Sequence, residues 1–515
     1  MLDSNIITQL KEVFSTLDRT IELVYAQSAH SKQQELEAML TDVASVSSHI
    51  SLRQGQTQSA YPRFEIFVNG KPNGISFSGI PGGHEFSTLI LAILHSSGQG
   101  KLPDPAMVDR IKNIQGPIHL KTYVSLSCEN CPDVAQAFNM MATFHPDMSH
   151  EVIDGEFVPE DIATLKIQGV PSVIDKDTLV HSGKSNLLEL IEKLEQHFGR
   201  VSTATADKNL GTFDVTIIGG GPAGVAAAIY TARKGLRTSL ITERVGGQVL
   251  DTKGIENFIS VPYTEGPDLS NALRTHLQKN EVTLFEHRRI NQIEYGDVKQ
   301  LHTSMQEVLQ TKALIIATGA KWRELNVAGE KQYLGRGVAF CPHCDGPYYK
   351  GKDVAVVGGG NSGVEAAIDL AGIVKSVTLL EFAPALKADQ VLVDRLMSLP
   401  NVKVITNVST QKIDGDGEKV TSIEIQHRDN EQNETILLDG VFVQIGLIPN
   451  SQFLGDAIEK TNWGEIKVTD KCRTNIKHVY AAGDVTTVPY KQIVIATGEG
   501  AKAGLTAFED LMITS

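Results

Sequence analysis

The sequence predicts an α/β protein in which two nucleotide-binding units follow a pair of smaller α/β lobes. Three observations indicate this fold. A strand, a glycine-rich turn and a helix occur twice in the C-terminal part, and a hairpin followed by a helix occurs twice in the N-terminal part. Four of the five cysteines form two Cys-x-x-Cys pairs. With 515 residues, the chain is long enough for three or four domains.

The composition is that of an ordinary soluble protein, with 41% hydrophobic and 21% charged residues. The net charge of −14 argues against nucleic acid or an anionic membrane as the main partner. No apolar run approaches the roughly 18 residues that span a bilayer. The N-terminus lacks the basic and apolar regions of a signal peptide. We therefore expect a cytoplasmic protein whose paired cysteines are catalytic rather than structural.

The N-terminal 198 residues are predicted to form two related lobes, at about 1–100 and 101–198. Residues 10–40 have the apolar spacing of one or two amphipathic helices. A hairpin, a Ser-Gly pair and a helix then follow at residues 64–94, and the same order returns at 171–198. Glu85, at the start of the first of these helices, is a candidate acid facing a redox cleft. An ordinary glutamate in a first helical turn is the simpler interpretation.

Residues 199–211 are small, polar and without periodicity, which predicts a linker. As a flexible coil, about a dozen residues have a root-mean-square reach of roughly 17–21 Å. That reach would let a domain swing between two docking positions.

Two strand–turn–helix units predict two Rossmann-like dinucleotide sites. The glycines allow a tight turn, close approach of a pyrophosphate and close packing of helix on strand, while the helix N-terminus supplies partial positive charge. The loop residues are Gly219, Gly220, Gly221, Pro222, Ala223 and Gly224 in the first unit, and Gly358, Gly359, Gly360, Asn361, Ser362 and Gly363 in the second.

An acidic residue ends the second strand of each unit, about 20 residues beyond its glycine loop. Glu243 and Glu381 would each accept hydrogen bonds from a ribose diol. Glu381 would also repel a 2′-phosphate, and residues 382–386 contain no arginine to pair with one. The second site is therefore expected to take NADH rather than NADPH.

The two cysteine pairs, Cys128/Cys131 and Cys341/Cys344, have the spacing of a nucleophilic thiolate with a resolving thiol one helical turn on. A buried structural pair or half of a zinc site is the alternative. A four-cysteine zinc cluster would require pairs from different modules to meet, so no metal is expected. Asp345, directly after the second pair, is a candidate proton donor and acceptor.

The first pair suits a thioredoxin-like redox fold, in which a cis-proline faces the cysteines; Pro171 is the candidate. Cys128 would be the exposed thiolate, stabilised by the helix N-terminus. The fifth cysteine, Cys472, stands alone and is expected to be a small buried residue.

Residues from about 213 to the end resemble the low-molecular-weight thioredoxin reductase group of the pyridine nucleotide-disulfide oxidoreductases. The N-terminal extension, with its own Cys-x-x-Cys, is similar to that of the flavoprotein components of bacterial alkyl hydroperoxide reductases. The basic 2′-phosphate motif of thioredoxin reductases is replaced here by residues 381–384 (Glu-Phe-Ala-Pro). The resemblance rests on residues 219–224, 246–248, 317–319, 341–346, 358–363, 482–484 and 491–493.

The resemblance implies an architecture, two cofactors and a homodimer. A tandem thioredoxin-like domain would occupy 1–198, an FAD domain 212–325 and 441–515, and an NAD domain with the redox disulfide 326–440. In such proteins the NAD domain rotates, so that the flavin meets nicotinamide and disulfide alternately, with Cys344 next to the flavin and Cys341 as the interchange thiol. The implied FAD residues beyond the glycine loop are Glu243, Gly247, Gln248, Asn257, Thr318, Gly319, Gly483 and Asp484, with Gln492 and Ile493 near the isoalloxazine ring.

The predicted function is that of an NADH-dependent flavoprotein disulfide reductase. Electrons would pass from NADH through FAD and the two cysteine pairs to the disulfide of a peroxiredoxin, supporting alkyl hydroperoxide reduction and defence against reactive oxygen species. Two alternatives remain open at this point. One is a thioredoxin reductase fused to its own thioredoxin-like domain and acting on many disulfides. The other is a redox-sensing scaffold that does not turn over.

Overall fold

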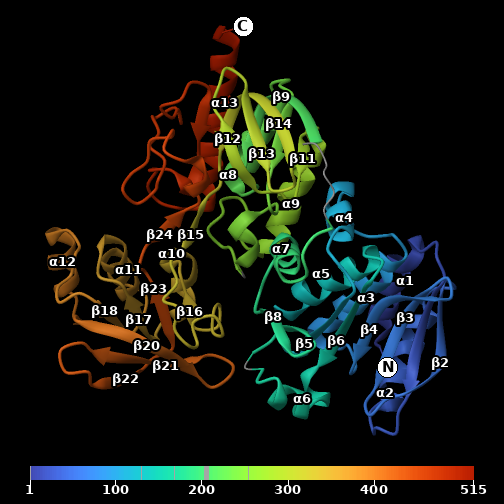
Figure 1. The fold of residues 1–515 in the computed structure, drawn as a ribbon. Coiled ribbons are helices and arrows are strands. Elements are labelled where there is room, and N and C mark those ends of the chain that lie inside the picture. Colours follow the sequence, from blue (N-terminus) through green and yellow to red (C-terminus); the bar gives the residue numbers. More distant parts are fainter. Residues whose placement is uncertain (1, 129, 168, 202–207, 253, 515) are drawn as a thin grey trace. The chain divides into compact units, whose positions relative to one another are not determined.

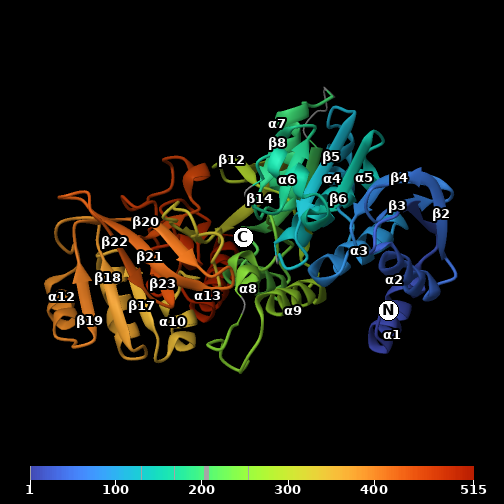
Figure 2. The same ribbon diagram turned by 90° about the horizontal axis from the view of Figure 1, so that it is seen from below.

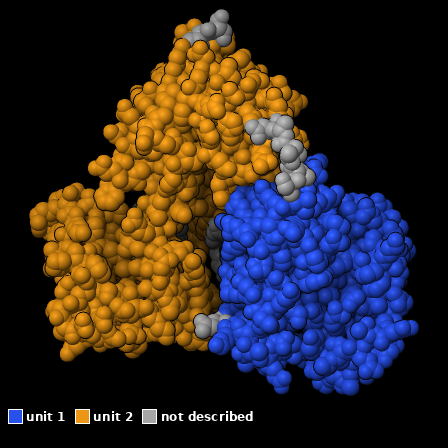
Figure 3. All heavy atoms as spheres, in the orientation of Figure 1, with its two compact units in different colours: residues 1–206 blue, residues 207–515 orange. Residues whose placement is uncertain are grey.

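The computed structural model describes residues 2–128, 130–167, 169–201, 208–252 and 254–514. The chain divides into two compact units, Met1–Ala206 and Asp207–Ser515 (Figure 3). Within the described residues, no helix combines the length and apolar character needed to cross a membrane.

The N-terminal unit is built on one sheet of eight strands in the order β2-β1-β3-β4-β6-β5-β7-β8 (Figure 1). The strands are β1 (Ile21–Gln27), β2 (Ile50–Gln58), β3 (Arg63–Val68), β4 (Lys71–Ser78), β5 (Ile118–Val124), β6 (Met148–Asp154), β7 (Ser172–Asp175) and β8 (Thr178–Ser182). The helices are α1 (Ser4–Val13), α2 (Gln33–Ser45), α3 (Phe86–Ser96), α4 (Pro105–Lys112), α5 (Cys131–Phe144), α6 (Pro159–Thr164) and α7 (Leu187–Phe198).

Each half of this sheet has the same strand order and directions, so the predicted repeat is confirmed. In both halves a parallel pair, β2-β1 or β6-β5, continues into an antiparallel hairpin, β3-β4 or β7-β8. Asn69 and Gly70 turn the first hairpin with φ of 50° and 76°, as their residue types predict. The two halves join edge to edge, because β4 pairs in parallel with β6.

The helical prediction for residues 10–40 was wrong in its middle, where the structure has strand β1. Ile21 and Leu23 are fully buried, and β1 has neighbours on both edges, β2 and β3. A short apolar run buried on both faces carries no periodicity that separates a strand from a buried helix segment. The flanking parts of the prediction are helices, α1 and α2.

The C-terminal unit contains two larger sheets. In the first, seven strands follow the order β11-β10-β9-β14-β13-β12, with β25 on β14. Its elements are β9 (Lys208–Ile218), β10 (Thr238–Ile241), β11 (Thr283–Phe285), β12 (Ile290–Glu294), β13 (Lys299–Thr303), β14 (Glu307–Ile316), β25 (Val479–Ala481), α8 (Pro222–Ala232), α9 (Gly266–Lys279) and α13 (Ile493–Thr514). Helix α13 lies directly on α8, since a Cβ on Gly500 would fall 1.9 Å from the carbonyl oxygen of Ala223.

The second sheet is parallel, in the order β16-β23-β17-β18-β19, and a three-stranded antiparallel sheet, β20-β21-β22, lies beside it (Figures 1 and 2). Buried side chains of both sheets share one hydrophobic core. The elements are β16 (Val338–Ala339), β17 (Asp353–Val357), β18 (Ser376–Leu380), β19 (Val402–Ile405), β20 (Val408–Gly415), β21 (Val420–His427), β22 (Asn433–Leu437), β23 (Gly440–Val443), α10 (Pro342–Asp345), α11 (Asn361–Ala371) and α12 (Gln390–Met397).

The chain passes twice between the seven-stranded sheet and the parallel sheet of the C-terminal unit. The two connecting segments run side by side and are hydrogen-bonded to each other. Strands β15 (Ala320–Trp322) and β24 (Leu447–Pro449) form an antiparallel ladder. Beside it, Thr318 Oγ1 donates to the carbonyl oxygen of Asn450 at 2.7 Å, and Asn450 Nδ2 donates back to that of Thr318 at 2.9 Å. In the parallel sheet, strand β23 ends at Val443. This is three residues beyond position 440, where the NAD domain was predicted to end.

The predicted linker overlaps strand β9, which begins at Lys208. Residues 208–211 pair with β14, a partner about 100 residues away that local composition does not reveal. Residues 202–207 of the predicted linker lie outside the described residues.

Candidate active site and nucleotide cradles

The first cysteine pair lies where β5 leads into α5. Cys131 is the first residue of α5 and is fully buried, whereas Cys128, in the preceding loop, is half-buried. The two cysteines form a disulfide. The backbone N–H of Cys128 donates to the carbonyl oxygen of Ser125 at 3.0 Å, which holds the loop. Cys128 is thus the more accessible sulfur, at the N-terminal end of the helix.

A second loop of the same unit faces this disulfide. The Cys128 Sγ atom lies 3.7 Å from the carbonyl oxygen of Val170, and the Val170–Pro171 peptide is cis. The backbone N–H of Gly183 donates to the carbonyl oxygen of Pro171 at 2.9 Å, so the end of β8 supports the loop. The structure therefore brings Pro171 to the Cys128–Cys131 pair across about 40 residues of sequence.

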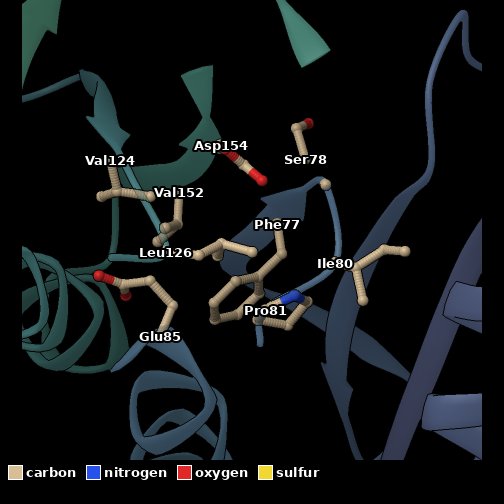
Figure 4. A pocket seen from close by; sticks show the side chains of 10 residues that line it. Phe77, Ser78, Ile80, Pro81, Glu85, Val124, Leu126, Val152 and Asp154 are labelled. Carbon is tan, nitrogen blue, oxygen red and sulfur yellow. The ribbon is translucent and has the colours of Figure 1, made fainter. Parts of the chain in front are cut away.

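Glu85 is buried rather than exposed in a first helical turn. It is 1% exposed and lines a small pocket of about 10 Å³ with Phe77, Leu126 and Asp154 (Figure 4). Neither carboxylate oxygen of Glu85 has a hydrogen-bond partner among the described residues. Burial raises the pKa of Glu85 to about 7; the neighbouring Thr88 side chain opposes this rise, and the nearby charge of Asp154 adds to it. Leu126 belongs to the loop that leads to Cys128, so Glu85 lies close to the loop that carries the first cysteine pair into α5.

Glu85→Gln should flatten the pH dependence of stability in the N-terminal unit. An acid whose pKa is raised from 4.5 to about 7 on folding binds more protons in the folded state between these pH values. The free energy of unfolding therefore falls as pH rises from about 4.5 to about 7, by up to about 3 kcal/mol. Hydrogen exchange of α3 amides at pH 5 and pH 8 measures this slope. The exposed Glu35→Gln is the matched control, and equal slopes in wild type and Glu85→Gln would show that Glu85 is ionised throughout.

The first glycine loop forms a cradle between β9 and α8. A Cβ on Gly219 would lie 2.2 Å from the carbonyl oxygen of Ala317, and one on Gly224 would lie 1.8 Å from that of Gly219. No side chain fits at either position. At Gly221, by contrast, a Cβ would meet nothing within 4 Å, and Gly221 is the N-cap of α8 without a side-chain cap. The space at the N-terminus of α8 is therefore open at Gly221, which suits a pyrophosphate.

The second loop repeats this geometry between β17 and α11. A Cβ on Gly358 would lie 2.3 Å from the carbonyl oxygen of Gln444, and one on Gly363 would lie 1.9 Å from that of Gly358. Gly360, the N-cap of α11, has no side-chain cap and open space around it. Both cradles fit a dinucleotide, and the two lie in separate sheets of the unit.

Two of the residues proposed from resemblance for the first cradle, Gly247 and Gly483, lie against its glycine loop. A Cβ on Gly247 would lie 3.3 Å from Gly221 Cα, and one on Gly483 would lie 2.9 Å from Ala223 Cβ. Asn257 Nδ2 donates to Gln492 Oε1 at 3.1 Å, which joins residues 235 positions apart. Burial raises the pKa of Asp484, while the charge of Lys491 opposes this. Gln248 is exposed in the turn after Gly247, and Ile493 begins α13.

Glu243 has a partner that the sequence did not indicate. Arg289 donates to both carboxylate oxygens of Glu243, at 2.9 and 3.1 Å. The ion pair is partly exposed, and it orients the carboxylate at the end of β10.

The second cysteine pair lies at the short helix α10, which contains position 344. Cys341 directly precedes α10 and is disulfide-bonded; the side chains of His343 and Cys344 lie outside the described set. Burial raises the pKa of Asp345 to about 6, and a hydrogen bond with the backbone of Cys341 acts in the opposite direction. A carboxyl group with this pKa exchanges protons readily near neutral pH.

Cys472 is the small buried residue that was expected. It is fully buried, and its Sγ atom donates to Glu499 Oε2 at 3.3 Å. Burial raises the pKa of its thiol to about 12, so it is not a reactive thiolate.

Comparison with known protein families shows which class of protein this chain belongs to. The sequence profile of the pyridine nucleotide-disulphide oxidoreductases matches residues 213–502, and a thioredoxin-domain profile matches residues 118–196. The chain belongs to the pyridine nucleotide-disulphide oxidoreductase family, and it is an oxidoreductase of the flavin- and pyridine-nucleotide-using type.

Relatives that match over their full length indicate which members of this family the chain is similar to. The chain is 46% identical to a protein of Escherichia coli (strain K12) that is named as a subunit of alkyl hydroperoxide reductase, over 100% of this chain and 99% of that protein. It is 44% identical to a protein named NADH dehydrogenase from Bacillus subtilis (strain 168), over 99% of both chains. Among solved structures, thioredoxin reductase from Streptococcus pyogenes MGAS5005 matches with a TM-score of 0.56 and 36% identity, over 59% of this chain and 99% of that one. The predicted family and fold class are thereby confirmed.

Proposed function

We propose that this protein is an NADH-dependent, FAD-containing disulfide reductase that delivers electrons to a peroxiredoxin and so supports the reduction of alkyl hydroperoxides. The observation that carries the proposal is the combination, in one chain, of two open glycine cradles and two Cys-x-x-Cys pairs. Its full-length likeness to proteins named as subunits of alkyl hydroperoxide reductase supports the same function. Because those relatives are named as subunits, their names also support the proposal that this protein acts together with a partner protein.

Each cradle would hold one nucleotide. The first, with Glu243, Asn257, Asp484 and Gln492, would bind FAD, and the second, with Glu381, would bind NADH. A bound flavin supplies the two-electron chemistry that links a nicotinamide to a disulfide. Asp345 would hold or release a proton beside the second cysteine pair.

The two cysteine pairs would form a relay by thiol–disulfide exchange. In the reduced pair, Cys341 attacks the N-terminal disulfide, and Cys344 resolves the mixed disulfide. This leaves Cys341–Cys344 oxidised and Cys128 and Cys131 as thiols. Cys128 then attacks the disulfide of the peroxiredoxin, and Cys131 resolves that mixed disulfide, so two electrons and two protons pass to the partner.

We further propose that the nucleotide domains meet at the paired strands β15 and β24, that the protein is a homodimer and that it acts in the cytoplasm. The hydrogen-bonded connecting segments support the first point. The use of four cysteines in redox pairs supports a reducing compartment.

Steady-state NADH oxidation tests the proposed function. The FAD-loaded protein is supplied with a purified peroxiredoxin and a peroxide, or with thioredoxin, at equal concentrations. Faster sustained turnover with the peroxiredoxin supports the proposal. Faster turnover with thioredoxin would support a general thioredoxin reductase, and no sustained turnover with either would support a redox-sensing scaffold.

The wild type should prefer NADH over NADPH by at least roughly tenfold in kcat/KM, or about 1.4 kcal/mol. Glu381 directly follows β18, is only 9% exposed and accepts hydrogen bonds from the backbone N–H groups of Gly359 (2.5 Å) and Ala383 (2.8 Å). These bonds hold its charge in place, so it cannot turn away from a 2′-phosphate. Initial rates with each nucleotide measure the ratio, and equal use of NADPH would contradict this role of Glu381.

Cys341→Ser should show a long-wavelength charge-transfer absorbance band when FAD is bound, because the remaining Cys344 thiolate is proposed to adjoin the flavin. Absorbance spectra between about pH 6 and 9 follow the ionisation of that thiol. A band in Cys344→Ser and not in Cys341→Ser would reverse the two roles.

A further inference from the structure

An arginine distant in sequence lies beside the acid of the second cradle. The Arg428 guanidinium stacks on the ring of Phe382, 3.8 Å from its centroid, and Phe382 directly follows Glu381. Arg428 Nη1 also donates to the carbonyl oxygen of Phe382 at 3.0 Å. Phe382 is 60% exposed, so the stack lies at the surface of the cradle rather than in its core.

Backbone contacts explain how this arginine reaches the site. Arg428 follows β21, and its N–H donates to the carbonyl oxygen of Asn407 at 2.9 Å. The N–H of Asn407 in turn donates to the carbonyl oxygen of Ala383 at 2.8 Å. The antiparallel sheet β20-β21-β22 therefore positions the Arg428 side chain beside the loop that follows β18.

Arg428 has an exposed side chain. Within the part of the chain that the structure describes, it forms no ion pair with a carboxylate. A stacked, planar guanidinium is well suited to bidentate recognition of a phosphate. In Rossmann-like domains, the corner after the second strand either presents an acid to the ribose 2′-hydroxyl or presents an arginine to a 2′-phosphate.

We propose that the loop after β18 has both the acid that binds a ribose 2′-hydroxyl and an arginine that can bind a 2′-phosphate. Arg428 is the latent 2′-phosphate-binding residue, and Glu381 prevents a 2′-phosphate from reaching it. The inference rests on the proposed function and deepens it. NADH selectivity would then come from the fixed charge of Glu381 and not from a missing cation. Neutralising Glu381 alone should be enough to admit a 2′-phosphate, because the pairing group is already held in place.

A second cation near the cradle provides the matched control. Lys387 is exposed, and its backbone N–H donates to the carbonyl oxygen of Gly359 at 2.8 Å. It has the same charge as Arg428 but neither the stack on Phe382 nor the planar donor group. If any nearby positive charge were enough, Lys387 and Arg428 would be interchangeable.

The test compares two ligands that differ only at the 2′ position, 5′-AMP and adenosine 2′,5′-bisphosphate. Binding to the FAD-loaded protein is measured by calorimetry and by competition with NADH. Glu381→Gln should bind the bisphosphate at least tenfold more tightly than the wild type does. Adding Arg428→Ala should remove that gain, whereas adding Lys387→Ala should keep most of it. The affinity of each variant for 5′-AMP corrects for damage to the cradle.

Three results would overturn the inference, and the first two are no gain in Glu381→Gln and a gain that survives Arg428→Ala. A gain lost equally with Lys387→Ala would also overturn it, because recognition would then be by unspecific charge. A wild type that binds neither 5′-AMP nor NADH would instead contradict the proposed function, so the two failures are distinguishable.

Discussion

Cys131→Ser should trap a covalent adduct between Cys128 and the peroxiredoxin. Cys128 lies in the loop before α5 and is half-buried, whereas Cys131 is fully buried at the first position of the helix. Attack by Cys128 on the partner disulfide therefore remains possible in this variant, but the resolving thiol is absent. Most of the chain should run as a mixed disulfide in non-reducing electrophoresis, and peroxide-dependent NADH oxidation should fall by on the order of 10³-fold.

Cys128→Ser is the control for this trap. It retains the buried Cys131, which should form little or no adduct. NADH should reduce the flavin normally in both variants, because that step precedes the N-terminal pair in the proposed relay. Mass spectrometry of the trapped complex locates the bond. An adduct mapped to Cys341 would mean that the N-terminal pair is bypassed.

A fragment beginning at Lys208 should keep flavin binding and lose peroxiredoxin reduction. The second compact unit begins at Asp207, and β9, which begins at Lys208, supplies central pairings of its sheet. The fragment contains both glycine cradles and the Cys341/Cys344 pair, so NADH-dependent reduction of small aromatic disulfides should continue. Peroxiredoxin turnover should fall on the order of 10²-fold or more, since the tethered exchange partner is gone.

Adding the N-terminal unit back as a separate chain is the control for the fragment. Restored turnover that rises with the concentration of added Met1–Ala206 would support a relay that tethering makes efficient. Reduction of the peroxiredoxin by the fragment alone at the full-length rate would contradict the relay. Retained flavin absorbance separates either outcome from misfolding.

Local signals in the sequence were enough for the features that depend on local backbone stereochemistry. Asn69-Gly70 predicted a hairpin because these residues tolerate positive φ, and the hairpin is present. The two glycine loops were recognisable because the backbone at Gly219 and Gly358 leaves no room for a Cβ. The lone Cys472 was expected to be buried, and it is.

Sequence separation limited what else could be inferred. Apolar periodicity could not distinguish the buried strand β1 from a helix, because its partners β2 and β3 follow later in the chain. The first residues of β9 resembled a linker because they are polar, and only pairing with β14 makes them a strand. The two N-terminal lobes were visible as a repeat, but their union in one sheet depends on the edge contact of β4 with β6.

By itself, the sequence determined the family, the two cradles, both cysteine pairs and the acids that follow β10 and β18, because each is a short motif whose chemistry follows from residue type and spacing. Only the tertiary structure decided which groups surround those motifs. It buries Glu85 without hydrogen-bond partners among the described residues, pairs Arg289 with Glu243 and stacks Arg428 on Phe382. The Arg289–Glu243 and Arg428–Phe382 contacts each join residues 46 positions apart, and the burial of Glu85 depends on desolvation by several elements at once. Burial and long-range contact set charge, pKa and specificity, and no local pattern encodes them.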